Sequence, residues 1–348
     1  MRKSIGFILL ALVLVILPLS VDCGAKQFTL VFESMHPATH SRVGTPAPVV
    51  AGWLDAVERE SGGRIKFERH WGGEPVPARE ALDALRLGTI DVLAASQLLY
   101  SGKIAIADIG IMPRNYKTFT DIFDLWWNSP LGKIIDGVYQ KRSNVKFMYP
   151  QVFAPENIQV SKRTKKIRTF EDLKGLKIRA AGGMANLSAK ALGASPVTTA
   201  SSEYYTAMQR GTIDAGIMTT YSLESYKMWE VCDQVVNPPI FNSCHIAVFM
   251  NLDTWKKVGP ELQKVMIDAI RKMETKIISF IHVDDARIEK IAKEKGVEFY
   301  TLPREEQDKM WKALEPVWDM YVDKCTKQGL GKEAEQVREI ISERFNAQ

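Results

Sequence analysis

The same four residues, Gly-Thr-Ile-Asp, occur twice at the same place in a predicted helix–turn–strand unit. Residues 78–87 have a helical pattern and are followed by Gly88–Asp91 and the apolar stretch 92–95. In the second copy, a predicted helix ends before Gly211–Asp214 and a strand follows. Glycine ends a helix well because it adopts positive φ without steric cost. The repeat predicts two similar α/β lobes, an arrangement that suits hinge closure around a ligand.

The second copy follows a stretch that carries a candidate anion-binding arginine. Leu176–Ala180 alternates like a strand, with Arg179 near its end and a glycine pair just beyond. In open α/β sheets, ligands bind beyond the carboxyl ends of the strands. A planar guanidinium stays charged and can hold both oxygens of a carboxylate. Arg179 is therefore the first candidate ligand-binding residue, and Ser201 or Ser202 is expected to cap the next helix.

Three segments of this region resemble one protein family. EDLKGLKIR (171–179), LGASPV (192–197) and EYYTAMQRGTIDAG (203–216) are similar to the second lobe of the DctP-type solute-binding proteins of TRAP transporters. FMNLDTW (249–255) continues the resemblance, which covers nearly all of the chain after residue 25. It implies an α/β, two-lobe periplasmic-binding-protein fold (type II-like), with a hinge cleft and a long helix spanning both lobes. In that family, the arginine at the end of the GLKIR strand binds the ligand carboxylate, and here that arginine is Arg179.

The resemblance also implies further ligand-facing positions, found by matching the flanking segments. Several depart from the better-known dicarboxylate and acidic-sugar receptors, including Met218, where an asparagine is common. A second arginine found in some members is absent, and Glu156 or Asn157 takes that region. The full set of candidate ligand-binding residues is Arg179, His36, Trp71, Ser96, Gln97, Glu156, Ser201, Met218, Thr219 and His245.

These departures bear on the kind of ligand. The loss of a second cation and of a polar asparagine argues against a dicarboxylate. The preferred hypothesis is a monocarboxylate whose apolar or aromatic body rests near Trp71 and Met218. If the side chain of Glu156 faces the cleft, it could take an ammonium group of the ligand.

The implied role is that of an extracytoplasmic receptor, not of an enzyme. Its partners would be a small organic acid and the small and large membrane subunits of a TRAP transporter. The alternative is delivery to a sensor kinase or to an ATP-driven importer. The sequence has no nucleophile elbow, phosphate loop or dinucleotide fingerprint, and its five histidines form no metal-binding constellation. No cofactor, metal or nucleic-acid partner is expected, and a monomer suits a receptor that docks and releases.

Residues 1–25 have the pattern of a secretory signal peptide. Two basic residues precede an apolar run that ends at Leu19 and is too short for a committed membrane anchor. Cleavage after Ala25 is favoured; it would place the protein in the periplasm and change the net charge from +5 to +4. Acylation of Cys23 is the less favoured alternative, because a lipoprotein signal needs a small residue before the cysteine and this chain has Asp22 there.

A chain of 348 residues suits two domains. A helical pattern over residues 261–295 is long enough to serve both lobes. The expected boundaries are residues 26–152 with 245–283 for lobe I, and residues 153–244 with 284–348 for lobe II and the C-terminal helices.

Three cysteines follow the predicted signal peptide. In an oxidising compartment Cys232 and Cys244 could close a short loop and leave Cys325 alone. The alternative is three buried thiols, and the spacing favours neither.

Overall fold

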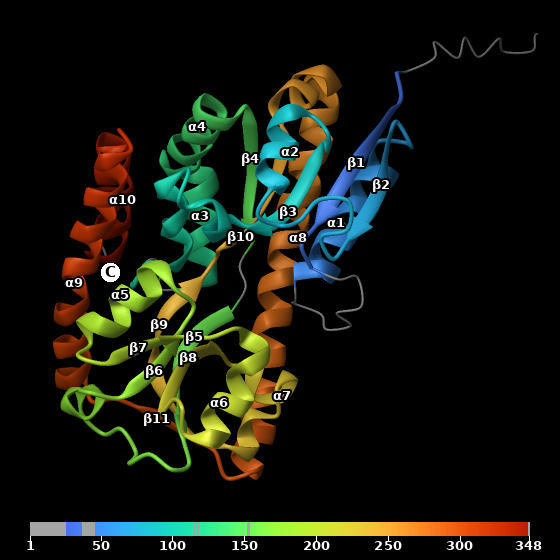
Figure 1. Cartoon of the computed structure of the whole chain (residues 1–348). Helices are drawn as coiled ribbons and strands as arrows, with labels where there is room; N and C mark the ends of the chain where they lie inside the picture. Colours follow the sequence, from blue (N-terminus) through green and yellow to red (C-terminus); the bar gives the residue numbers. More distant parts are fainter. Residues whose placement is uncertain (1–25, 37–45, 115, 117, 152–153, 347–348) are drawn as a thin grey trace, which may run out of the picture.

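The computed structural model places the chain in two α/β halves, each built on one sheet with helices on its faces (Figure 1). It describes residues 26–36, 46–114, 116, 118–151 and 154–346. The two-lobe α/β fold predicted from the sequence is confirmed. The predicted signal peptide and Cys23 lie outside the described residues.

The first sheet has five strands in the order β2-β1-β3-β10-β4. Its strands are β1 (Phe28–Ser34), β2 (Ile65–Trp71), β3 (Val92–Ser96), β4 (Val145–Gln151) and β10 (Ile246–Asn251). β1 is parallel to β2 and β3, whereas β10 is antiparallel to β3 and β4. The helices of this half are α1 (Pro46–Glu60), α2 (Ala81–Leu87), α3 (Phe119–Asn128) and α4 (Leu131–Ser143), with 3-10 turns at Gln97–Tyr100 and Ala105–Ile111. The apolar face of α1 is buried, including Trp53, Leu54 and Val57.

The second sheet has six strands in the order β11-β9-β5-β8-β6-β7. Its strands are β5 (Ala154–Ser161), β6 (Lys177–Ala180), β7 (Ser195–Thr198), β8 (Ala215–Thr219), β9 (Cys232–Ser243) and β11 (Glu298–Thr301). β6 is parallel to β7 and β8, and β5 is antiparallel to β8 and β9. The helices and 3-10 turns of this half are α5 (Gly183–Ala191), α6 (Tyr204–Arg210), α7 (Ser222–Ser225), Phe170–Leu173, Ser201–Glu203 and Met228–Glu230.

The halves are connected where β4 leads to β5, where β9 leads to β10, and along α8 (Leu252–Glu294). α8 contacts α1, α3, β4 and β10 of the first half, and α7 and β11 of the second, so the predicted long helix does serve both (Figure 1). α9 (Arg304–Lys327) packs on α5 and on α10 (Gly331–Asn346). α10 in turn packs on α4 of the first half, although the sequence analysis grouped it with lobe II. The residue boundaries of the lobes stay a prediction.

The repeated Gly-Thr-Ile-Asp unit has the same geometry in both halves. Gly88 ends α2 at φ 78° and ψ 18°, and Gly211 ends α6 at φ 74° and ψ 18°. Asp91 exchanges two hydrogen bonds with β1, one through its carboxylate and one through its backbone N–H. Asp214 makes the same exchange with β6. The repeat therefore fixes the position of β1 in the first half and of β6 in the second half, and both strands end at the border between the halves.

α8 begins at Leu252, before the predicted start at Glu261. Asn251 caps it by accepting a backbone N–H at 2.9 Å. Gly259, at φ 78°, and Pro260 then interrupt the helix. The sequence pattern detected only the part beyond this kink, because the short first segment ends in two helix-breaking residues.

The described cysteines Cys232, Cys244 and Cys325 are free and buried. Cys232 begins β9 and Cys244 follows its last residue, so an extended strand separates the two thiols. Twelve residues at roughly 3.3 Å each place them far beyond the reach of a disulfide. Of the two alternatives left open by the sequence, the structure has the buried thiols.

Candidate functional site

Arg179 lies near the end of β6 and is 5% exposed, although its side chain is cationic. Its guanidinium donates to the carbonyl oxygens of Thr199 and Ile217, both at 3.3 Å, and to the Ser201 hydroxyl at 3.2 Å. It also donates to the sulfur of Met218 at 2.8 Å. Among the residues that the structure describes, Arg179 forms no ion pair. A buried cation held only by neutral acceptors is costly, which favours binding of an anion beside it.

A glycine beside this arginine makes room for the ring of Tyr204. Gly216 of β8 lies opposite Arg179 in the sheet register. The ring of Tyr204 packs against Gly216, and a Cβ atom there would lie 2.3 Å from the ring carbon Cε2. The same ring centroid lies 6.0 Å from the guanidinium carbon, within the range of a cation–π contact. Tyr204, the first residue of α6, thus braces Arg179 from one side.

Ser201 does not cap α6 as the sequence predicted. α6 begins at Tyr204 after the residue Glu203, whose side chain makes no capping hydrogen bond, and a 3-10 turn separates Ser201 from the helix. The hydroxyl of Ser201 instead accepts the hydrogen bond from Arg179. The predicted cap at Ser201 or Ser202 was wrong, because both residues lie in the 3-10 turn before the helix. That Ser201 contacts the ligand stays a prediction.

Glu156 of β5 lies close to this cluster and is 6% exposed. It pairs in register with Thr219 of β8, which is 3% exposed. Burial raises the pKa of the Glu156 carboxyl to about 7, while a hydrogen bond with Ser243 and the positive charge of Arg179 both oppose that rise. Glu156 and Arg179 are near enough to interact electrostatically without forming an ion pair.

A second group of predicted residues meets at the connection between β9 and β10. His245 lies there, and its Nδ1 atom is hydrogen-bonded to the hydroxyl of Ser243. Burial, and secondly the nearness of His36, lower the pKa of His245 to about 4. The backbone N–H of Gln97 donates to the backbone carbonyl of His245 at 2.8 Å. The side-chain amide of Gln97 donates to the backbone carbonyl of Cys244 at 3.1 Å. Ser243, which sequence reasoning missed, links this group to Glu156.

Of the remaining candidates, Ser96 lies beside the second group, opposite Ile246 in the sheet register, and Trp71 lies at the far edge of the first sheet. Ser96 ends β3, and its N–H contacts the sulfur of Met35 at 3.0 Å. Trp71 ends the edge strand β2, with its ring 5.1 Å from that of Phe32. In the part of the chain that the structure describes, no contact joins Trp71 to Met218 or Arg179. Whether any of these residues touches a ligand stays a prediction.

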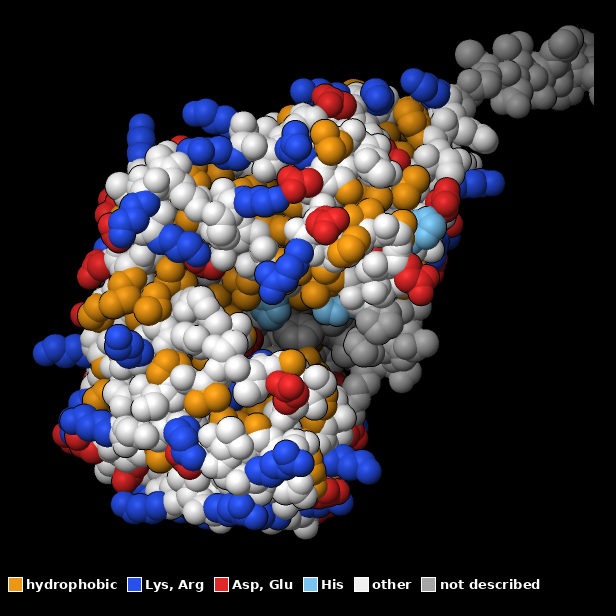
Figure 2. All heavy atoms as spheres, in the orientation of Figure 1, with side chains coloured by type: hydrophobic (Ala, Val, Ile, Leu, Met, Phe, Trp, Pro, Cys, Tyr) orange, Lys and Arg blue, Asp and Glu red, His pale blue; other side chains and the backbone are white. Residues whose placement is uncertain are grey.

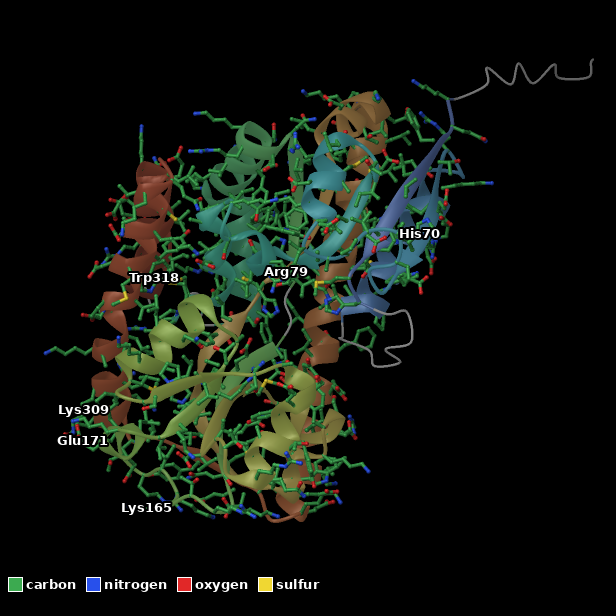
Figure 3. All side chains as sticks on the ribbon, viewed as in Figure 1. His70, Arg79, Lys165, Glu171, Lys309 and Trp318 are labelled. Carbon is green, nitrogen blue, oxygen red and sulfur yellow. The ribbon has the colours of Figure 1, made fainter. Side chains whose placement is uncertain are left out.

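Figure 2 shows a hollow between the two halves, with histidine side chains gathered at its upper edge. Figure 3 places Arg79 at the lower border of the upper half, facing this gap, and His70 on the outer flank. Arg79 is exposed, and no hydrogen bond or ion pair to a described residue restrains it. Arg79 was not among the predicted site residues, because an exposed arginine just before a helix carries no distinguishing pattern.

The comparisons with known proteins show the family of the chain. The sequence profile of the bacterial extracellular solute-binding proteins of family 7 (DctP) matches residues 47–324. A solute-binding protein of Albidiferax ferrireducens is 25% identical over 255 residues, which are 69% of this chain and 73% of that protein. The C4-dicarboxylate-binding protein DctB of Bacillus subtilis is 23% identical over 310 residues, which are 86% of this chain and 84% of that protein.

Solved structures share the fold. A TRAP periplasmic solute-binding protein of Rhodoferax ferrireducens with bound malonate has a TM-score of 0.76 at 20% identity, over 92% of this chain and 100% of that chain. One from Desulfovibrio salexigens with bound orotic acid has a TM-score of 0.75 at 17% identity, over 91% of this chain and 99% of that chain. At these identities the likeness establishes the two-lobe fold alone.

Proposed function

Because the chain belongs to the bacterial extracellular solute-binding proteins of family 7, we propose that it captures a small monocarboxylate with an apolar or aromatic body and delivers it to a TRAP-type secondary transporter. The family consists of transport receptors for small organic acids, not of enzymes. The family match confirms the receptor class predicted from the sequence. The kind of acid and the membrane partner are what we propose here.

One observation carries the proposal: Arg179 is buried, cationic and in contact only with neutral acceptors among the described residues. A carboxylate that replaced the weak thioether acceptor of Met218 would gain charge-assisted hydrogen bonds to a planar donor. Closure of the two halves would exclude water, so that the ion pair would be poorly screened. A carboxylate is thus the group that this site is suited to hold.

The surroundings of Arg179 support a ligand with one carboxylate and an apolar body. Met218, Tyr204 and the backbone of β8 line its neighbourhood, and Met218 is 6% exposed. In the described part of the second sheet, no other cation lies beside Arg179 to hold a second carboxylate. We place the apolar body of the ligand beside Met218, with Trp71 of the opposing half approaching on closure.

The family supports a location for the receptor and a route of delivery. TRAP solute-binding proteins are periplasmic. Across the described residues, every helix is too short or too polar to traverse a bilayer. We propose that the receptor docks as a monomer on the small and large TRAP membrane subunits; a sensor kinase or an ATP-driven importer is the alternative recipient.

A thermal-shift screen tests the proposed ligand class. The arms are monocarboxylates with apolar or aromatic bodies, C4 dicarboxylates and sugar acids. A specific ligand at 100 times its Kd adds about 2.7 kcal/mol to the stability of the folded protein. We expect the first arm to stabilise the wild type and to leave Arg179→Ala unchanged. Stabilisation by dicarboxylates or sugar acids alone would refute the monocarboxylate assignment.

Delivery is tested by reconstitution. The receptor with its ligand is added to liposomes that contain the TRAP membrane subunits, and uptake is followed under a sodium gradient. We expect uptake that needs both the receptor and the gradient. If the receptor instead supports uptake only through an ATP-driven importer, the alternative recipient is favoured.

A further inference from the structure

We propose that the groove between α1 and α8 is a second binding site, and that it takes a free fatty acid, a single alkyl chain with an anionic head. The groove lies on the first half of the molecule, whereas Arg179 lies in the second. Among the described residues that line it, none is a candidate ligand-binding residue of the cleft. The inference therefore goes beyond the proposed function and does not depend on which acid the cleft binds.

The groove is hollow because small residues lie where the two helices meet. α1 packs against α8 (Figure 1), and the groove beside this contact has a volume of about 350 Å³. A Cβ atom on Gly52 of α1 would lie 3.4 Å from the terminal methyl carbon of Met273 of α8. Ala56 and Ala269 also line the groove, and they are 8% and 1% exposed. Small-molecule sites have mostly apolar walls and volumes of about 300–1,000 Å³, so this groove has the size of a site for one slender ligand.

The two helices run in opposite directions along the groove. Arg64, just beyond the end of α1, pairs with Glu261 in the first part of α8 at 2.6 Å. Farther along α8, Met273 faces Gly52. The end of α1 therefore lies beside the earlier part of α8, and the start of α1 lies beside the later part. This order decides which lining residues share an end of the groove.

One end of the groove is basic. It is lined by Arg59 of α1 and Lys272 of α8, together with the carboxylate of Glu60. Glu60 lies 2.8 Å from Lys272 and 3.5 Å from Arg59, so one carboxylate serves two cations. Lys276, one turn farther along α8, also lines the groove and forms no ion pair with any residue that the structure describes. Among the lining residues, three cations thus face one anion, and this surplus of positive charge complements an anionic head group.

The other end of the groove is apolar. It is lined by Val49 from the start of α1 and by Ile277 and Phe280 of α8. Phe280 is 48% exposed, and it is one of four large apolar side chains that are exposed in the described chain. An alkyl chain that lies against this ring would remove apolar surface from water. A ligand with an anionic head at the basic end and an alkyl chain that extends toward Phe280 matches both ends.

The dimensions of the groove favour a free acid over the surface of a bilayer. Its lining on α8 extends from Ala269 to Phe280, which is about 16 Å of helix axis. An extended dodecanoate ion has a similar length. The volume is at the low end of the range for ligand sites and leaves room for one chain, whereas a bilayer lipid carries two. A helix that binds a membrane surface buries a protruding apolar face in the lipid, but here the apolar residues line a hollow.

Isothermal titration calorimetry tests the site in the Arg179→Ala variant, which lacks the cation proposed to hold a carboxylate in the cleft. The probes are dodecanoate, butanoate and dodecyltrimethylammonium, each below its micelle-forming concentration. Butanoate has the same head on a short chain, and the ammonium compound has the same chain with a cationic head. We expect dodecanoate to bind at least about tenfold more tightly than either of the other two.

Two variants in the same background test the groove itself. Gly52→Leu fills its centre and should weaken dodecanoate binding by about tenfold or more. Lys276→Glu replaces the unpaired cation and should weaken binding by about threefold or more. The matched control is Lys290→Glu, at an exposed lysine of α8 outside the groove, and it should bind normally. Because Lys276 is exposed, Lys276→Glu keeps the test valid should Gly52→Leu fold poorly.

Fluorescence quenching locates the chain within the groove. Phe280→Trp adds an indole at the apolar end. Dodecanoate brominated at its terminal carbon should quench the added fluorescence, and dodecanoate brominated beside its carboxylate should quench it much less. Equal quenching by the two acids would contradict the proposed orientation.

Three other results would overturn the inference. The first is binding of the cationic amphiphile as tightly as dodecanoate, and the second is normal dodecanoate binding in both Gly52→Leu and Lys276→Glu. The third is binding of the protein to phosphatidylglycerol vesicles without binding of free dodecanoate, which would favour a membrane surface as the occupant. Dodecanoate that binds the wild type but not Arg179→Ala would also count against the groove, while it would support the proposed function of the cleft.

Discussion

The guanidinium of Arg179 donates a hydrogen bond to the sulfur of Met218, 2.8 Å away. A thioether is a weak acceptor, so this contact satisfies the cation poorly. The other acceptors of Arg179 are two backbone carbonyls and the hydroxyl of Ser201. The arginine is therefore rigidly placed and still lacks a charged partner in the described structure, which makes it the centre of the proposed site.

Replacement of Arg179 should abolish most of the binding. Loss of one partner of a buried charged pair costs about 2–5 kcal/mol, because the other charge is left unpaired. For Arg179→Ala this corresponds to a Kd on the order of 30- to 5,000-fold higher. The measurement is a titration with the best acid of the thermal-shift screen. Arg210→Ala, at the exposed C-terminal end of α6, is the control and should bind normally. Unchanged affinity in Arg179→Ala would remove this residue from the site.

Gly216→Ala should destabilise the second half and disturb the site. The added Cβ would lie 2.3 Å from a ring carbon of Tyr204, which is fully buried and braces Arg179. Overpacking of a core typically costs about 1–3 kcal/mol. The control is Gly137→Ala in α4, where nothing lies within 4 Å of the new atom. That change should stabilise by about 0.4–1 kcal/mol. Urea unfolding measures both, and equal stability of the two variants would contradict this account.

The repeated aspartates should contribute to stability in the same way. Asp91 accepts from the N–H of Val31 at 2.9 Å, and Asp214 accepts from the N–H of Lys177 at 2.8 Å. Asp91→Ala leaves a part-buried N–H without its acceptor, a loss of about 1–3 kcal/mol. Asp214→Ala exposes the N–H of Lys177 to water, because Lys177 is itself exposed, so its loss should be nearer to about 0.5–1.5 kcal/mol. Asp91→Ala should cost more, because Asp91 also accepts from the hydroxyl of Thr254 at 2.7 Å. Chemical denaturation of the single and double variants should show that the losses in free energy of unfolding are nearly additive. A marked excess in the double variant would show that the halves are coupled through these residues.

Glu33→Gln should change how stability depends on pH. Glu33 is 1% exposed, and among the described residues neither of its carboxyl oxygens has a hydrogen-bond partner of good geometry. Burial raises its pKa to about 7, although His70 and the backbone of Gly73 oppose that rise. Between pH 4.5 and 7 the folded protein therefore holds this proton while the unfolded chain has lost it. As the pH rises through that window, this group lowers the free energy of unfolding by up to about 3 kcal/mol, and its effect is constant above the window. Glu33→Gln should match the wild type at pH 4.5 and exceed it at pH 8, as measured by urea unfolding. A constant difference at both values would show that Glu33 does not titrate as stated.

The elements that were predicted well have local signals. Alternation or helical periodicity predicts two strands, at residues 27–33 and 246–251, and a helix at residues 304–327. The structure has β1, β10 and α9 at or within a residue of these bounds. β9 was not predicted, since two adjacent prolines, Pro238 and Pro239, interrupt its pattern. Proline normally argues against a strand within a sheet, and here the pairing of β9 with β5 overrides that local preference.

The sequence by itself determined the two α/β units and the arginine at the end of β6. Both depend on short-range patterns: apolar alternation, and glycines that adopt positive φ after a helix. Only the tertiary structure decided that Glu156 is buried near Arg179 without touching it, and that Ser243 links Glu156 to His245. Those relationships depend on strand order and register across β9, β5, β8 and β6. A shift of one residue in any of these pairings would turn the side chains to the opposite face, and no local pattern specifies it.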